Sequence, residues 1–106
     1  MIKVYSIAKI IVEDSSTDMS SKIVNILAYP NPSNNKINIS FYVENNQNII
    51  VDLISSSGKK MFFDSIENFA GDYYKSIDVN DYPEGIYLLQ IISGKSIQNK
   101  KILIVK

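Results

Sequence analysis

The sequence predicts an all-β protein, an antiparallel sandwich of about seven short strands. Three observations lead to this prediction. Apolar side chains occupy every second position of residues 36–43, as in a strand with one buried face. Turn-forming residues recur about every 8–12 positions, the spacing typical of sandwiches. No stretch of helical length carries a 3.6-residue period, and the 106 residues are enough for one domain with a modest core.

The turn at residues 29–35 is the most rigid part of the sequence. Pro30 and Pro32 flank Asn31, and each proline fixes φ near about −65° and removes a backbone donor. A helix or an inner strand is therefore excluded there. A short apolar strand at residues 23–28 leads into this turn.

The remaining strands are separated by polar or glycine-containing turns. These turns are residues 44–48, 55–58, 80–85 and the hinge Gly94–Lys95, with a looser stretch at 66–72. They predict strands at residues 37–43, 49–54, 59–63, 73–79, 86–92 and 96–106.

The alternation also predicts the core. The inward side chains are expected to be Ile37, Ile39, Phe41, Val43, Ile49, Val51, Leu53, Tyr87, Leu89 and Ile91. The last strand is ambiguous because residues 102–105 are all apolar. Such a strand is either central or carries an outer face meant for a partner.

The first 21 residues differ from the rest. Residues 2–12 are β-branched and could form a strand, and residues 13–21 are small and polar like a linker. We therefore divide the chain into residues 1–21, which could be the tail of a neighbouring domain, and a domain of residues 22–106. The N-terminus does not resemble a signal peptide, and no stretch approaches the length of a transmembrane segment.

The composition argues against several functions. The 11 lysines balance 11 acidic residues, and there is no arginine, so the basic footprint of a nucleic-acid-binding protein is missing. Histidine and cysteine are also absent. The usual metal ligands, thiolate nucleophile and imidazole base are therefore lacking, and we expect no catalysis, metal or cofactor.

Two groups of residues have alternative interpretations. The polar residues Asp78, Asn80, Asp81 and Glu84 could form a calcium loop, but their spacing does not fit the EF-hand, and turn formation explains them better. The seven tyrosines could form a platform for sugar stacking, or could bury their rings at sheet edges.

The order of these signals resembles one family. Tyr29-Pro30-Asn31-Pro32, an alternating strand, Gly58-Lys59, Gly85-Ile86-Tyr87 and a lysine-ended apolar strand closely resemble the type A C-terminal sorting domain of the type IX secretion system of Bacteroidota. The likeness covers about residues 26–106.

The resemblance implies an immunoglobulin-like β-sandwich that acts as a non-catalytic sorting signal. It implies a covalently linked upstream cargo, passage through the periplasm, recognition by the outer-membrane translocon, cleavage by a partner sortase within residues 13–22, and delivery to the cell surface or outside the cell. The recognition residues implied by position are Pro30, Asn31, Pro32, Gly85, Tyr87, Lys101, Ile102, Leu103, Ile104, Val105 and Lys106.

A terminal strand at a sheet edge also has a physical consequence. Its unpaired backbone groups can accept a strand from a partner, or pair between two copies of the chain. The alternative function is an accessory immunoglobulin-like module that binds a glycan or a protein.

Overall fold

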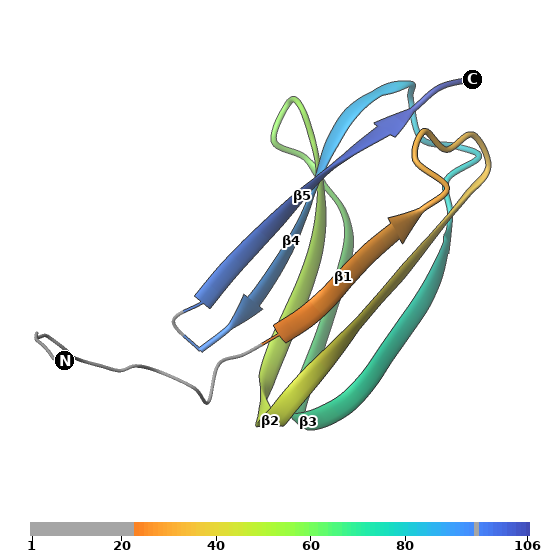
Figure 1. Cartoon of the computed structure of the whole chain (residues 1–106). Helices are drawn as coiled ribbons and strands as arrows, with labels where there is room; N and C mark the ends of the chain where they lie inside the picture. The colour runs from red at the N-terminus through yellow and green to blue at the C-terminus, as the bar shows by residue number, and fades with distance from the viewer. Residues whose placement is uncertain (1–22, 95) are drawn as a thin grey trace, which may run out of the picture.

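The computed structural model describes residues 23–94 and 96–106, and all regular elements in those ranges are β-strands (Figure 1). All pairs of strands are antiparallel. The all-β prediction is therefore confirmed. Within the same ranges, no helix has the length and apolar character needed to cross a membrane. The strands are β1 (Ile23–Tyr29), β2 (Lys36–Ser55), β3 (Lys60–Asp78), β4 (Gly85–Ser93) and β5 (Ser96–Ile104).

Five strands are found where the sequence predicts about seven, because the expected breaks at residues 44–48 and 66–72 lie inside β2 and β3. The two strands stay paired through this region, with register shifts between Val43 and Gln47 and between Gln47 and Ile49. On β3, Gly71 has a φ of 103°, a conformation that favours glycine. Figure 1 shows that the paired strands fold back on themselves here.

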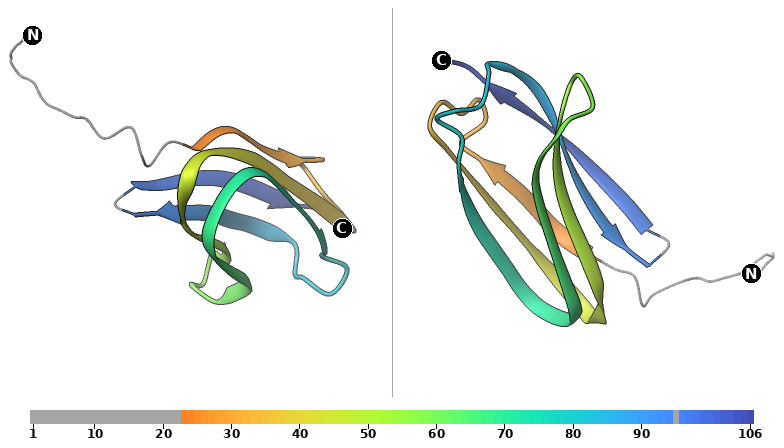
Figure 2. Two further views of the ribbon diagram at one scale, coloured as in Figure 1. Left: turned by 90° about the horizontal axis from the view of Figure 1, so that it is seen from below. Right: turned by 180° about the vertical axis from the view of Figure 1, so that it is seen from behind.

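Each half of β2 pairs with a different neighbour. β1 pairs only with the first half of β2, up to Val43, whereas β4 pairs only with residues 49–55. β5 then pairs with β4. Figure 2 shows the β1 side and the β4–β5 side facing each other, joined by the folded β2–β3 ribbon. One continuous pair of strands thus contributes to both layers.

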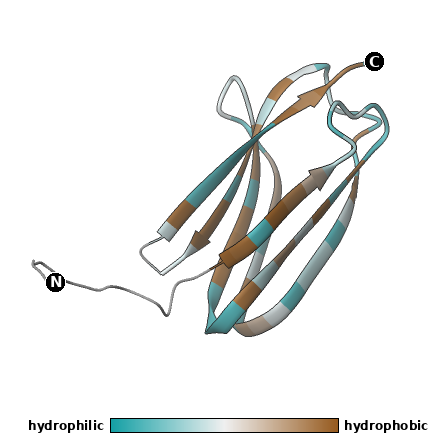
Figure 3. Ribbon diagram, in the orientation of Figure 1, coloured by the Kyte–Doolittle hydropathy of each residue, from teal (hydrophilic) through white to brown (hydrophobic). Residues whose placement is uncertain are grey.

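The core lies between these two sets of strands. All ten predicted core residues are buried, from Ile37 on β2 to Ile91 on β4. The structure also decides the phase of the last strand: Ile102 and Ile104 are fully buried, whereas Leu103 and Val105 face outward. Figure 3 shows the resulting alternation of apolar and polar positions along the strands.

The described part of the chain is elongated, with extents of 51 × 25 × 21 Å. β1 begins far from the C-terminus and runs toward it (Figure 1). The start of β1 and the C-terminus therefore lie far apart. The predicted strand at residues 2–12 and linker at residues 13–21 lie outside the described residues.

Candidate functional site

Three segments meet at the C-terminal end of the molecule (Figure 1). They are the proline turn at residues 30–35, the β3–β4 connection at residues 79–84 and the tail at residues 101–106, and hydrogen bonds join both of the first two to the tail. We call this assembly the latch. It contains most of the site residues expected from the sequence.

The side-chain amide of Asn31 hydrogen-bonds to the backbone of the tail in the way that the backbone of a neighbouring strand would. Its Nδ2 donates to the carbonyl oxygen of Lys101 at 3.1 Å, and its Oδ1 accepts from the N–H of Leu103 at 3.0 Å. The double contact needs one donor and one acceptor in the same side chain, and the amide group of asparagine provides both. Both prolines follow cis peptide bonds.

Ser33 continues the pairing through its backbone. Its N–H donates to the carbonyl oxygen of Leu103, and its own carbonyl oxygen accepts from the N–H of Val105, both at 2.9 Å. This forms a parallel bridge between Ser33 and Ile104. The Ser33 side chain is buried, and its hydroxyl donates to the carbonyl oxygen of Lys36.

Lys106 ties the tail to both neighbouring segments. Its Nζ donates to the carbonyl oxygens of Asn34 (2.9 Å), Val79 (2.7 Å) and Asn80 (3.1 Å). Its backbone N–H donates to Glu84 Oε1 at 3.0 Å. Three carbonyl oxygens match the three donors of an ammonium group, so the lysine acts as a structural clamp.

These contacts correct one expectation from the sequence. The terminal strand was expected to lie at a sheet edge and to offer unpaired backbone groups. β5 is an edge strand, but at residues 101–105 the outward carbonyls of Lys101 and Leu103 and the outward N–H groups of Leu103 and Val105 are hydrogen-bonded to the turn. β4 occupies the other edge. Strand addition at residues 101–105 would therefore have to displace the turn. The sequence suggested an exposed edge because the turn's contacts come from residues about seventy positions away.

Gly85 and Tyr87, at the start of β4, contact two segments of the latch. Gly85 pairs with Ile104 and has a φ of 151°, in the range that favours glycine. Tyr87 is buried, which raises the pKa of its hydroxyl, and that hydroxyl donates to the carbonyl oxygen of Pro83. Tyr87 therefore contributes by fixing the connection rather than by exposing its ring.

The comparison with family models now decides the identity. The model for the secretion system C-terminal sorting domain matches residues 27–106, which include all three segments of the latch. The chain belongs to this sorting-domain family. Its members serve as type IX secretion signals and are generally non-catalytic. A comparison with curated proteins finds no match.

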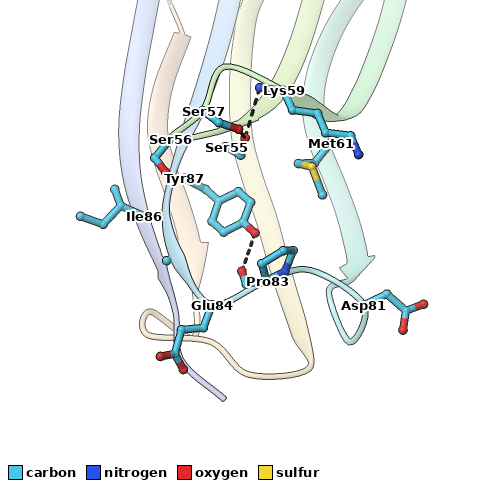
Figure 4. A pocket seen from close by; sticks show the side chains of 11 residues that line it. Ser55, Ser56, Ser57, Lys59, Met61, Asp81, Pro83, Glu84, Ile86 and Tyr87 are labelled. Atoms are coloured by element: carbon cyan, nitrogen blue, oxygen red, sulfur yellow. Dashed lines mark hydrogen bonds between the residues drawn. The ribbon is translucent and has the colours of Figure 1, made fainter.

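The sorting domain has a hollow of about 360 Å³ beside the latch (Figure 4). The Tyr87 ring lies at its centre, while the carboxylates of Asp81 and Glu84 point away from it on opposite sides. Ser55 Oγ shares a hydrogen bond with the Ser57 hydroxyl and accepts a hydrogen bond from the backbone N–H of Lys59. The hydroxyls of Ser55, Ser57 and Tyr87 thus already have partners, and the two carboxylates do not converge with them on a common point.

The acidic cluster makes one local and one long-range hydrogen bond. Asp78 Oδ1 accepts from the N–H of Asn80 at 2.9 Å, whereas Glu84 Oε1 accepts from the N–H of Lys106, 22 residues away. The Asp78 contact and the backbone hydrogen bond from the Tyr82 N–H to the Val79 carbonyl support the interpretation of the cluster as a turn. Within the described ranges, no three His, Cys, Asp or Glu side chains are grouped as a metal site would need.

The tyrosines of the sorting domain fall into two groups. Tyr73, Tyr82 and Tyr87 are buried or half-buried, and burial raises the pKa of each hydroxyl. Tyr29 on β1, Tyr42 on β2 and Tyr74 on β3 are exposed. Tyr42 and Tyr74 line a shallow hollow of about 240 Å³ together with Leu27 and Ser40.

Sequence reasoning did not identify Ser33 and Glu84 as parts of the site. Both bond to the tail through ordinary groups, a backbone amide and a carboxylate, and both lie far from it in the sequence. Their only local signal is that each lies next to a residue of the family motif, Pro32 or Gly85.

Proposed function

We propose that this chain is the C-terminal sorting signal of an exported cargo protein, that the outer-membrane translocon of the type IX system recognises its latch end, and that it performs no chemistry. The cargo, linked upstream of residue 22, passes through the periplasm. A partner sortase cuts within residues 13–22, and the cargo stays at the surface or is released outside.

The proposal includes an immunoglobulin-like sandwich for residues 22–106. Because β2 and β3 each serve both layers, their four halves and the three remaining strands make seven strand segments, which fits the predicted arrangement of about seven. The cargo would then join near the start of β1, away from the latch.

The observation that carries the function is the position of the latch inside the family match. The turn, the connection and the tail all lie within residues 27–106. The same segments form one hydrogen-bonded end of the molecule, distant from the start of β1 (Figure 1). A receptor can therefore bind this end while the cargo extends from the other.

The test is to fuse the full 106-residue chain behind an exported reporter in a host that carries the type IX machinery. We expect the reporter at the cell surface or in the medium, with an N-terminal fragment ending within residues 13–22. The control is the same fusion in a strain that lacks the translocon. Equal surface exposure in both strains would exclude the sorting function.

Removing residues 101–106 is a poor test by itself, because Ile102 and Ile104 are fully buried and the truncated domain would lose part of its core. Lys106→Met is cleaner, since it removes the clamp and leaves the core in place. We expect reporter delivery to fall several-fold, whereas Lys100→Met, at an exposed position of β5 outside the latch, should have little effect.

A second candidate function, a glycan-binding module, is favoured by the outer face of β1, β2 and β3. Leu27 and Tyr74 flank Ser40 in the strand register, and the exposed ring of Tyr42 lies two positions along β2. The Tyr74 hydroxyl donates to Asn38 Oδ1 at 2.9 Å, which orients its ring. Small polar residues between aromatic rings suit a neutral sugar.

The glycan hypothesis is tested by affinity electrophoresis of the chain in gels that contain soluble neutral polysaccharides. We expect retardation that Tyr74→Ala abolishes and that Phe63→Ala, an exposed aromatic on another face, leaves unchanged. Unretarded migration in every gel would remove this candidate.

A further inference from the structure

We propose that the receptor of this sorting signal recognises the latch in its closed form, by placing an apolar side chain in the hollow between the prolines and the tail, rather than by adding a strand to the tail. This inference rests on the proposed function and specifies how the same end of the domain is recognised.

The first argument is the hydrogen bonding of the tail. Strand addition at residues 101–105 would break the two contacts of Asn31 and the two backbone contacts of Ser33. An incoming strand could at best replace these bonds, so it would gain little from the exchange. The displaced turn would also lose the Asn34 contact of Lys106.

The second argument is the surface that remains available. A hollow of about 350 Å³ is lined by the rings of Pro30 and Pro32, by Val105, and by Ser33, Asn34 and Lys106. Val105 is 43% exposed. The polar groups of the lining are largely engaged: the Ser33 hydroxyl, the Asn34 carbonyl and the Lys106 ammonium all have partners.

The two arguments together define the chemistry of the partner. The apolar part of the hollow consists of two pyrrolidine rings and the methyl groups of Val105, and the Ser33 hydroxyl, the Asn34 carbonyl and the Lys106 ammonium beside them already have partners. A leucine, methionine or phenylalanine side chain would bury apolar surface against these rings and methyl groups. A charged side chain would lose part of its hydration against the same apolar groups.

The first experiment locks the latch with a disulfide. Ser33 and Ile104 are bridge partners, and the chain has no cysteine of its own, so Ser33→Cys combined with Ile104→Cys gives one defined cross-link in the oxidising periplasm. Thiol labelling measures how completely it forms. We expect the locked fusion to reach the surface within about twofold of the Ile104→Cys single variant.

A locked fusion that stays in the periplasm, while the single variant is delivered, would overturn recognition of the closed form. The outcome differs from failure of the sorting function itself, in which the unmodified fusion would not be delivered either.

The second experiment fills the hollow without opening the latch. Val105→Lys places a long charged side chain at its rim, and we expect surface delivery to fall at least tenfold with unchanged thermal stability. Ile97→Lys is the matched control, because Ile97 is 58% exposed on β5, the strand that leads into the tail, but does not line the hollow. Normal delivery of Val105→Lys would exclude the hollow as the contact.

Discussion

The two ends of this molecule are held together by different forces. At the bend end, aromatic packing dominates: the rings of Phe41 and Tyr73 stack with centroids 4.5 Å apart, and Phe69 meets Tyr73 edge-on at 6.3 Å. The latch end also has an aromatic pair, Tyr82 and Tyr87 with centroids 5.9 Å apart, but its three segments are joined by hydrogen bonds from Asn31, Ser33 and Lys106. Packing contributes several kcal/mol per side chain and polar contacts about one each, so the latch is the easier end to open.

This difference agrees with the proposed roles of the two ends, in which the bend end holds the fold and the latch end contacts the receptor. The bend end turns β2 and β3 from one layer to the other and has to stay fixed for the fold to exist. The latch end carries the closed surface that the receptor is proposed to contact, and the loss of a few of its hydrogen bonds would leave the core in place except around Ile102 and Ile104. Stability is therefore concentrated away from the surface that a receptor would contact.

The largest expected effect is at the bend end. Tyr73 is 4% exposed, and Tyr73→Ala should lower the free energy of unfolding by about 3–5 kcal/mol because it leaves a cavity between two rings. Its neighbour Tyr74 is 61% exposed, and Tyr74→Ala should cost well under half of that. Urea denaturation followed by tyrosine fluorescence or circular dichroism measures both. Equal losses would contradict the contrast between buried and exposed rings.

At the latch end, Asn31→Asp should lower the free energy of unfolding by about 1–2 kcal/mol. The carboxylate keeps the acceptor for Leu103 but loses the donor to Lys101 and places a negative charge against its carbonyl. Asn46→Asp makes the same change at the bend end, where the side chain is exposed, and should be near neutral. A comparable loss in both variants would indicate a general charge effect.

Alkaline pH should weaken the bend end. Burial, then the hydrogen bond to Asp64 and its charge, raise the pKa of Tyr73 well above the ordinary value. The neutral Tyr73 hydroxyl therefore contributes its full stabilisation of the folded chain below about pH 10. This stabilisation is lost as the pH rises above that value, because the hydroxyl ionises in the unfolded chain before it ionises in the folded one. The loss should be on the order of 1 kcal/mol at pH 11.

Tyr73→Phe is the matched variant for this pH dependence. It keeps the ring but has no hydroxyl to ionise, so its stability should fall less steeply between pH 10 and 11 than that of the parent chain. Denaturant midpoints at each pH give both slopes. Parallel slopes would mean that other groups, such as the lysines, account for the alkaline loss.

The smallest expected effect is that of the clamp. Lys106→Met should lower the free energy of unfolding by about 1 kcal/mol, since the carbonyls of Asn34 and Asn80 can bond to water once the ammonium is gone. Hydrogen exchange should rise locally at Leu103 and Val105. Lys101→Met, at an exposed position of the same tail, should leave exchange unchanged.

The alternation of residues along the chain was enough to predict the all-β class and ten core positions, because burial of one face requires apolar side chains at every second residue. The turn of Pro30, Asn31 and Pro32 and the family motifs were visible for a similar reason. Each depends on neighbours in the sequence, so the local pattern contains the information.

Only the tertiary structure decided the number of strands, the phase of the tail and the closure of the latch. β2 and β3 remain continuous because each hydrogen-bonds to the other across the bend, and Ile102 rather than Leu103 is buried because β5 lies beside β4. Asn31 bonds to residues 70 and 72 positions away. Such partners come together only when the chain folds, so the identity of a single residue does not reveal them.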